Sequence, residues 1–147
     1  MFSCNQPKKE EKQSTKEEQP IQNEQTDIMD KSVSLSVKPD VFKFTNIPDT
    51  VTVTMINHTN DTITTGLYYS IEKLEASEWK QVSPKDIVFH DLGWRLKPNN
   101  TESFTKKLYK DQINYTVGKY RIVKYYLKSD YQKTKEDFNI YAEFKVE

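Results

Sequence analysis

Short runs in which hydrophobic and polar residues alternate dominate the chain after Lys31. Residues 33–37 and 51–55 place Val, Leu or Met at every second position, and residues 138–146 do the same with Phe, Ile, Ala and Val. A period of two is typical of a β-strand with one buried face. Pro, Asn and Asp bound these runs at 38–40 and 57–61, where they favour turns. The pattern therefore predicts separate, short strands.

The same reasoning predicts further strands along the chain. They are expected at 63–74, 78–82, 87–89, 94–96, 101–109 and 118–127. The run 118–127 is β-branched or aromatic on both faces, which favours a central strand. Residues 128–137 are polar and predict a loop, with room for a short helical turn. Seven or more short strands without an amphipathic helix predict an all-β, antiparallel sandwich.

The first 31 residues have a different composition. Between Asn5 and Lys31 the chain is rich in Gln, Glu and Lys, and its few apolar residues are Ile21, Ile28 and Met29. Such a segment buries too little apolar surface to offset its conformational entropy, so we expect a disordered linker. The predicted organisation is a linker over 1–31 and one domain over 32–147. A coil of 27 residues would span ~30 Å.

Cys4 is the single cysteine, so no disulfide can form within the chain. The sequence Met-Phe-Ser-Cys before the polar linker resembles the end of a lipobox, the signal after which bacterial lipoproteins carry a lipid on their cysteine. The run from Lys8 to Glu11 resembles the signal that exports some lipoproteins to the outer membrane and cell surface. These resemblances imply an extracytoplasmic protein held to a membrane by a lipid on Cys4.

A second resemblance concerns the domain over 32–147. A strand ending in Asn at 51–57, a strand at 71–73 followed by Trp79, the turn Leu-Lys-Pro-Asn-Asn at 96–100 and the closing Gly-Lys-Tyr-Arg-Ile at 118–122 resemble bacterial immunoglobulin-like domains. This resemblance implies an immunoglobulin-like β-sandwich of about seven to nine strands and a binding or scaffolding role. The order of strands is also similar to that of a small bacterial proteinase inhibitor, which we keep as an alternative.

The charge balance and the small number of histidines and cysteines narrow the classes of function that the chain could have. The chain has 22 basic and 22 acidic residues, a balance that argues against nucleic acid as a partner. Its two histidines, His58 and His90, and one terminal thiol are few for a metal site or a catalytic triad. We therefore expect no enzyme, no metal and no cofactor. The expected form is a monomer that binds an envelope protein or a glycan.

Aromatic residues are the candidates for structure and for binding. Trp79 is predicted to anchor the core, because a small domain without disulfides needs large buried side chains. Trp94 and Arg95, next to a glycine, and Tyr68 and Tyr126 are the candidate binding surface. Trp94 could also pack against the end of a sheet. Because adjacent residues of a strand point to opposite faces, one tyrosine of each adjacent pair is expected to face the core.

Two short motifs concern modification. Asp-Thr-Val at 49–51 and Asp-Thr-Ile at 61–63 resemble sites at which some bacteria attach O-glycans to exported proteins. Thr50 and Thr62 are therefore candidate glycosylation sites. Both motifs also fit an ordinary transition from a turn to a strand.

Overall fold

The computed structural model describes residues 32–147, in which it places ten strands and one short helix. In chain order the elements are β1 (Val33–Lys38), β2 (Val41–Phe42), β3 (Thr50–Asn57), β4 (Ile63–Gly66), β5 (Ser70–Glu75), β6 (Glu78–Gln81), β7 (Gly93–Leu96), β8 (Thr101–Lys107), β9 (Gly118–Tyr126), α1 (Tyr131–Thr134) and β10 (Phe138–Val146). Within this part of the chain, no helix is long and apolar enough to cross a membrane.

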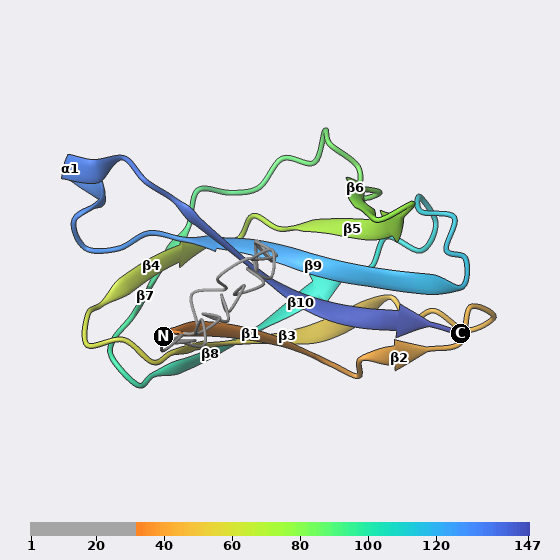
Figure 1. The fold of residues 1–147 in the computed structure, drawn as a ribbon, viewed down its shortest axis with the longest axis horizontal. Coiled ribbons are helices and arrows are strands. Elements are labelled where there is room, and N and C mark those ends of the chain that lie inside the picture. The colour runs from red at the N-terminus through yellow and green to blue at the C-terminus, as the bar shows by residue number, and fades with distance from the viewer. Residues whose placement is uncertain (1–31) are drawn as a thin grey trace, which may run out of the picture.

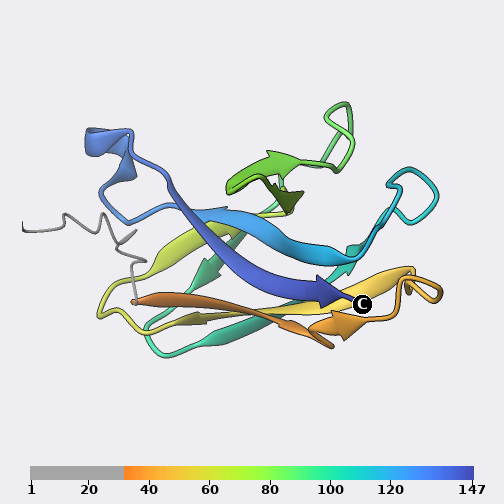
Figure 2. The same cartoon turned by 45° about the vertical axis from the view of Figure 1, so that its right-hand side comes forward.

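Two sheets face each other, as Figures 1 and 2 show. One sheet has the order β1-β3-β8, and the other has the order β2-β10-β9-β5-β6. All pairings are antiparallel except the short one between β2 and β10, which is parallel. Strands β4 and β7 form a separate ribbon, which a bridge between Thr64 and Leu127 connects to the end of β9. The predicted antiparallel sandwich is confirmed.

The core lies between the two sheets and follows the predicted alternation. Val51, Val53 and Met55 of β3 are buried, and every second residue of β10 from Ile140 to Val146 is buried opposite them. Tyr120 of β9 stacks on Phe144 with ring centroids 5.4 Å apart. Strands with one buried face therefore account for most of the apolar surface that the domain removes from water.

The predicted strand at 63–74 is wrong in one respect, because the chain bends in its middle. The bend at Leu67–Tyr69 separates β4 from β5, so that the two halves join different sheets. Two buried lysines described below bind the backbone oxygens of this bend. The expected strand at 87–89 belongs to no sheet in the described part of the chain.

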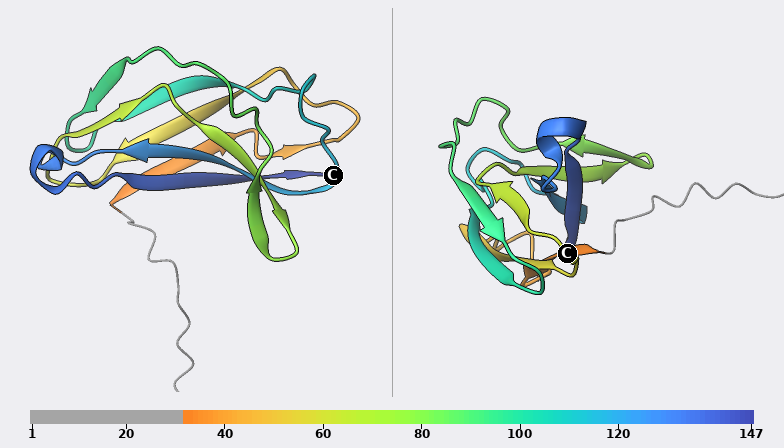
Figure 3. Two further views of the ribbon diagram at one scale, coloured as in Figure 1. Left: turned by 90° about the horizontal axis from the view of Figure 1, so that it is seen from above. Right: turned by 90° about the vertical axis from the view of Figure 1, so that its left-hand side faces the viewer.

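Trp79 is not a core anchor, which corrects the prediction. Ala76 and Ser77 both have positive φ and make the tight turn of the β5–β6 hairpin, which projects from the sandwich in Figure 3. In this register Trp79 pairs with Leu74 on the edge strand β6, and its indole is only half-buried. A large aromatic side chain on an edge strand can cover the outer face of a sheet as well as fill the core.

A tyrosine links β9 to the loop that precedes it. The Tyr120 hydroxyl donates to the Thr116 carbonyl oxygen at 2.9 Å and accepts from the Thr116 backbone N–H at 3.0 Å. Tyr115 donates its hydroxyl to the Leu108 carbonyl oxygen at 2.6 Å in the same loop. A tyrosine near the start of this strand that bonds back to the preceding loop is the tyrosine corner of sandwich folds. These bonds fix the loop between β8 and β9.

We predict that Tyr120→Phe lowers the free energy of unfolding by about 1–2 kcal/mol, because two backbone groups of Thr116 lose their partner. Urea denaturation followed by circular dichroism measures the change. Tyr141→Phe is the matched control, since the Tyr141 hydroxyl has no hydrogen bond within residues 32–147, and it should change stability by less than about 0.5 kcal/mol. Equal effects of the two substitutions would contradict the structural role of the corner.

Candidate binding face

The outer face of the five-stranded sheet carries an ordered stack of side chains. The Arg121 guanidinium carbon lies 4.4 Å from the centre of the Trp79 ring and 4.3 Å from the centre of the Tyr141 ring. The strand β9 turns Arg121 outward because its neighbours Tyr120 and Ile122 face the core. The cation is therefore held between two aromatic rings from β6 and β10.

Glu72 completes this group, which we call the arginine stack (Glu72, Trp79, Arg121, Tyr141). Arg121 Nε lies 2.5 Å from Glu72 Oε2, across the β5–β9 pair. All four side chains are partly accessible. Trp, Tyr and Arg are the residues most enriched where proteins bind one another, and here a sheet holds them in fixed positions. The sequence reasoning missed Arg121 and Tyr141, although the alternation of β9 and β10 places both on the outer face.

An aromatic corner lies beside the bend between β4 and β5. The Tyr68 ring meets Phe89 edge to face with centroids 5.4 Å apart, and it lies 6.5 Å from the Tyr125 ring. Tyr68 is 49% exposed. Gly66 lets the Tyr125 side chain lie close to the backbone, because a Cβ at this position would lie 2.4 Å from the Tyr125 hydroxyl oxygen and would force it to shift. The corner is a second accessible aromatic group, lined by both the bend and the loop after β6.

Two lysines are buried on the inner side of the same bend. Lys124 of β9 is 1% exposed and Lys106 of β8 is 4% exposed. Lys124 Nζ donates to the Gly66 oxygen at 2.6 Å and the Tyr68 oxygen at 3.4 Å, and Lys106 Nζ donates to the Leu67 oxygen at 2.9 Å. Neither lysine has a carboxylate partner within residues 32–147.

The aromatic ring of Phe104 lies close to both ammonium groups, 5.1 Å from Lys106 Nζ and 4.6 Å from Lys124 Nζ. Burial lowers the pKa of Lys106 to about 8. Burial, and secondarily the charge of Lys106, lowers the pKa of Lys124 to about 7. The three carbonyl oxygens and the ring stabilise the charged forms, whereas the loss of water and the mutual repulsion oppose them. Both side chains are thus inside the domain, although lysines mostly lie on the surface of a protein.

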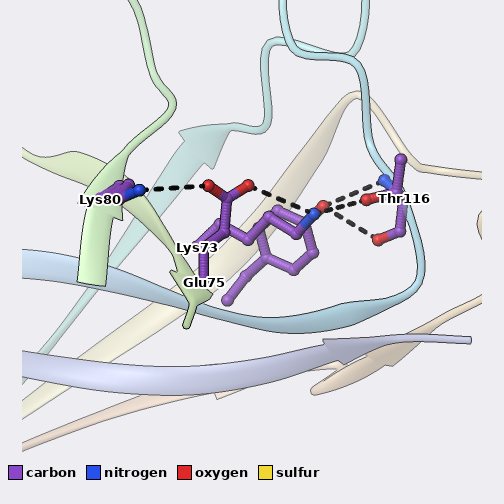
Figure 4. A network of polar contacts seen from close by, with 5 residues as sticks. Lys73, Glu75, Lys80 and Thr116 are labelled. Atoms are coloured by element: carbon purple, nitrogen blue, oxygen red, sulfur yellow. Dashed lines mark hydrogen bonds and ion pairs between the residues drawn. The ribbon is translucent and has the colours of Figure 1, made fainter. Parts of the chain in front are cut away.

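A polar network closes the other end of the five-stranded sheet (Figure 4). Lys73 Nζ donates to the Thr116 hydroxyl at 2.6 Å and lies 3.6 Å from Glu75 Oε1. Lys80 Nζ lies 3.8 Å from the second oxygen of Glu75. The Lys80–Glu75 pair is about half exposed, and ion pairs of this kind contribute little to stability, whereas Lys73 connects the hairpin to the loop before β9.

The predicted binding residues do not form one site. Tyr126 is 0% exposed and stacks on Phe138 at 5.2 Å, so its assignment to a binding surface is wrong. Its neighbour Tyr125 takes the outward position, because adjacent residues of β9 face opposite sides. Trp94 is half-buried and meets Phe104 edge to face at 5.5 Å, while Arg95 is exposed beside it on β7. Trp94 therefore mainly packs against its neighbours, as the alternative prediction for this residue had it, and only part of its ring is accessible.

The remaining candidates stay predictions. Cys4 and the proposed linker over 1–31 lie outside the described residues. Thr50 is exposed at the start of β3, where an O-glycan could reach it. Thr62 is half-buried, and its backbone N–H donates to Asp61 Oδ1 at 2.9 Å.

The histidines lie apart from one another in different turns and loops. His58 Nε2 lies 3.2 Å from the Ser34 hydroxyl, whereas His90 is in the loop before β7. Within residues 32–147, no three His, Cys, Asp or Glu side chains converge so that they could hold a metal ion.

The sheet order, with its tyrosine corner, agrees with a comparison to known families. Residues 29–145 match the family model of the bacterial Ig-like domain. The chain belongs to this family. Such domains are generally non-catalytic binding or scaffolding modules, and no curated protein sequence matches the chain. The family assignment confirms the predicted resemblance to bacterial immunoglobulin-like domains, and it confirms the predicted fold.

We predict that Trp79→Ala leaves the Ig-like domain folded and lowers its free energy of unfolding by only about 1–2 kcal/mol, the scale of a partly exposed stack. Tyr126→Ala, which empties a fully buried position, should cost about 3–5 kcal/mol. Denaturant melts of the two variants give the comparison. Loss of a cooperative transition in Trp79→Ala would restore the core-anchor interpretation.

We also predict that the Ig-like domain becomes more stable between pH 6 and pH 9. The folded pKa values of Lys106 and Lys124 lie below the unfolded value of 10.5, so the unfolded chain binds more protons in this range. Up to pH 9 this amounts to about two pKa units for Lys124 and about one for Lys106, so at 1.36 kcal/mol per unit the gain is on the order of 4 kcal/mol. Tyrosines ionise in the unfolded chain only near pH 10, so they do not interfere.

Urea melts at each pH measure this gain. Lys124→Met should reduce the slope of stability against pH, and Lys119→Met, which removes an exposed lysine from the same strand, should leave the slope unchanged. If Lys124→Met fails to fold, the dependence of the parent's stability on pH tests the prediction alone. A parent stability that is flat or falls between pH 7 and pH 9 would show that both lysines keep ordinary pKa values.

Proposed function

We propose that the chain is a lipid-anchored, non-catalytic binding module that works outside the bacterial cytoplasm and holds an envelope protein or glycan. The observation that carries the binding role is the arginine stack on the outer face of the five-stranded sheet. A sheet keeps such a group in a fixed position, so a partner meets side chains that have little rotamer freedom left to lose. The family to which the chain belongs supports a non-catalytic module.

The anchor is proposed from the sequence. The single cysteine, Cys4, precedes a polar segment that separates it from β1. Several acyl chains on one residue would hold the protein stably at a membrane, whereas one short chain would not. The proposed location is the outer membrane. The run from Lys8 to Glu11 favours display of the protein at the cell surface. The proposed form is a monomer.

The proteinase-inhibitor alternative gains less support. An inhibitory loop resists cleavage because hydrogen bonds hold it rigid in an extended form. The segment 85–91 contains Val88, the most exposed large hydrophobic residue in residues 32–147, and its backbone N–H groups have no hydrogen-bond partner in this part of the chain. This loop therefore lacks the hydrogen bonds that an inhibitory loop needs in order to resist cleavage.

The anchor is tested by expressing the protein from its full gene in a Gram-negative host. We expect an intact mass above that of the polypeptide by a lipid-sized increment, together with partitioning into the detergent phase. Cys4→Ser is the matched control and should lose both properties, because the thiol that accepts the lipid is gone. A parent protein without added mass that stays in the aqueous phase would refute the anchor and leave the binding role to be judged separately.

A further inference from the structure

The loop between β6 and β7 contains a segment with the side-chain pattern of a strand and no neighbouring strand. In Ile87-Val88-Phe89 the first and third side chains are half-buried, and Val88 between them is 91% exposed. β-branched and aromatic residues in alternation are typical of a strand and unusual in a loop. The loop runs along one side of the sandwich in Figure 3, between the hairpin and β7.

The backbone of this segment is free to form hydrogen bonds. Within residues 32–147, none of the N–H or C=O groups of Ile87, Val88 and Phe89 has a hydrogen-bond partner. The nearest backbone bond joins the Leu92 N–H to the His90 oxygen at 2.9 Å. A row of unpaired backbone groups beside exposed apolar side chains is the arrangement to which an extended chain adds as a further strand.

Exposed apolar side chains gather around the segment. Of the six large hydrophobic residues that are exposed in the described part of the chain, Tyr68, Val88 and Leu92 lie on this loop or at the bend beside it. Phe89 attaches the segment to the sandwich, because its ring meets Tyr68 at 5.4 Å and Tyr69 at 5.6 Å, both edge to face. A cluster of this kind marks an interaction surface more often than scattered single residues do.

A pocket of about 300 Å³ adjoins the segment. The aromatic corner (Tyr68, Phe89, Tyr125) and the carboxylate of Asp91 contribute to its walls. Burial, together with the charge of Asp91, raises the pKa of Tyr125, so this charge acts at the aromatic wall. Aromatic faces and a carboxylate together favour a cation.

Charge along the loop agrees with this preference. Asp86 and Asp91 are exposed on either side of the apolar segment, while Lys85 precedes Asp86 and His90 lies beside Asp91 among the residues that line the pocket. The buried cation Lys124 lies on the other side of the bend, where the Gly66 and Tyr68 oxygens and the Phe104 ring surround it. The pocket lining therefore combines aromatic rings with one carboxylate, from Asp91, and one imidazole ring, from His90.

We propose that Ile87–Phe89 accepts an extended segment of a partner protein as an added β-strand, and that a lysine or arginine of that segment enters the pocket of Tyr68, Phe89, Tyr125 and Asp91. This inference deepens the proposed binding function and rests on it, but not on the lipid anchor. Backbone hydrogen bonds to the added strand would supply the affinity. The pocket would supply the selectivity for a basic side chain.

The test titrates the ¹⁵N-labelled full chain with two pentapeptides, acetyl-Thr-Val-Arg-Val-Thr-amide and its counterpart with Glu in place of Arg. We expect saturable shifts of the backbone amide signals of Ile87, Val88 and Phe89 with the Arg peptide. Binding of the Glu peptide should be about tenfold weaker, and Asp91→Asn should reduce the preference for Arg. Slower hydrogen exchange at Val88 in the complex would show that its N–H has acquired a partner.

Two variants at one position separate strand addition from simple apolar contact. Val88→Pro removes the backbone N–H and should abolish binding, whereas Val88→Thr keeps the N–H and should retain it. Both should melt like the parent, because the segment has no hydrogen bonds to lose within residues 32–147. Unchanged binding by Val88→Pro, or equal binding of the two peptides, would refute the proposal.

Other occupants of the surface give different results in the same spectra. Shifts at residues 87–89 that depend on protein concentration without peptide would assign the surface to a second copy of the chain. Shifts there with a neutral oligosaccharide such as cellohexaose, and none with either peptide, would assign it to a glycan. Each result overturns the basic segment as the partner, and the glycan result leaves the proposed binding function standing.

Discussion

The structure depends on the contact between two buried ammonium groups and the backbone of one bend. Lys106 and Lys124 come from facing strands of the two sheets, and they bind the oxygens of Gly66, Leu67 and Tyr68. Gly66 is the last paired residue of β4, and the carbonyl groups of Leu67 and Tyr68 after it bind a lysine and pair with no strand within residues 32–147, at the point where the chain leaves one sheet and enters the other at β5. A buried cation normally destabilises a fold. Here it fixes the point at which the chain changes sheets.

The bend also decides which aromatic residues are accessible. Tyr69 turns inward, donates its hydroxyl to the Lys107 oxygen at 2.8 Å and stacks on Tyr109. Its neighbour Tyr68 is left on the outside, beside Phe89 and Tyr125. Strand β9 makes the same division along its length, since Tyr120, Ile122, Lys124 and Tyr126 face the core while Arg121, Val123 and Tyr125 face outward. The core and the candidate binding face are therefore two sides of one strand.

The sequence predicted what depends on local alternation. The strand 138–146 was predicted with its observed bounds, and the buried face of β3 was correct, because a period of two reports the faces of a strand directly. Trp79 and Tyr126 were assigned to the wrong sides because residue type was weighed above position. Lys106 and Lys124 could not be distinguished from surface lysines, since their burial depends on carbonyl groups some 39 and 58 residues away. The partner of Arg121 across the sheet is likewise a property of register, which the pattern of one strand does not contain.

The rigidity of the bend has a consequence for binding at the loop beside it. Ordering a free backbone costs roughly 1–2 kcal/mol per residue, which weakens any complex formed by an unstructured loop. The lysines hold the bend, which forms one wall of the pocket, before a partner arrives. The packing of Phe89 on two tyrosines holds the centre of the loop. Only the residues between these fixed points need to be ordered on binding. An added strand can offset that cost with its own backbone hydrogen bonds, whereas a purely apolar contact at Val88 could not, because one exposed valine buries too little surface.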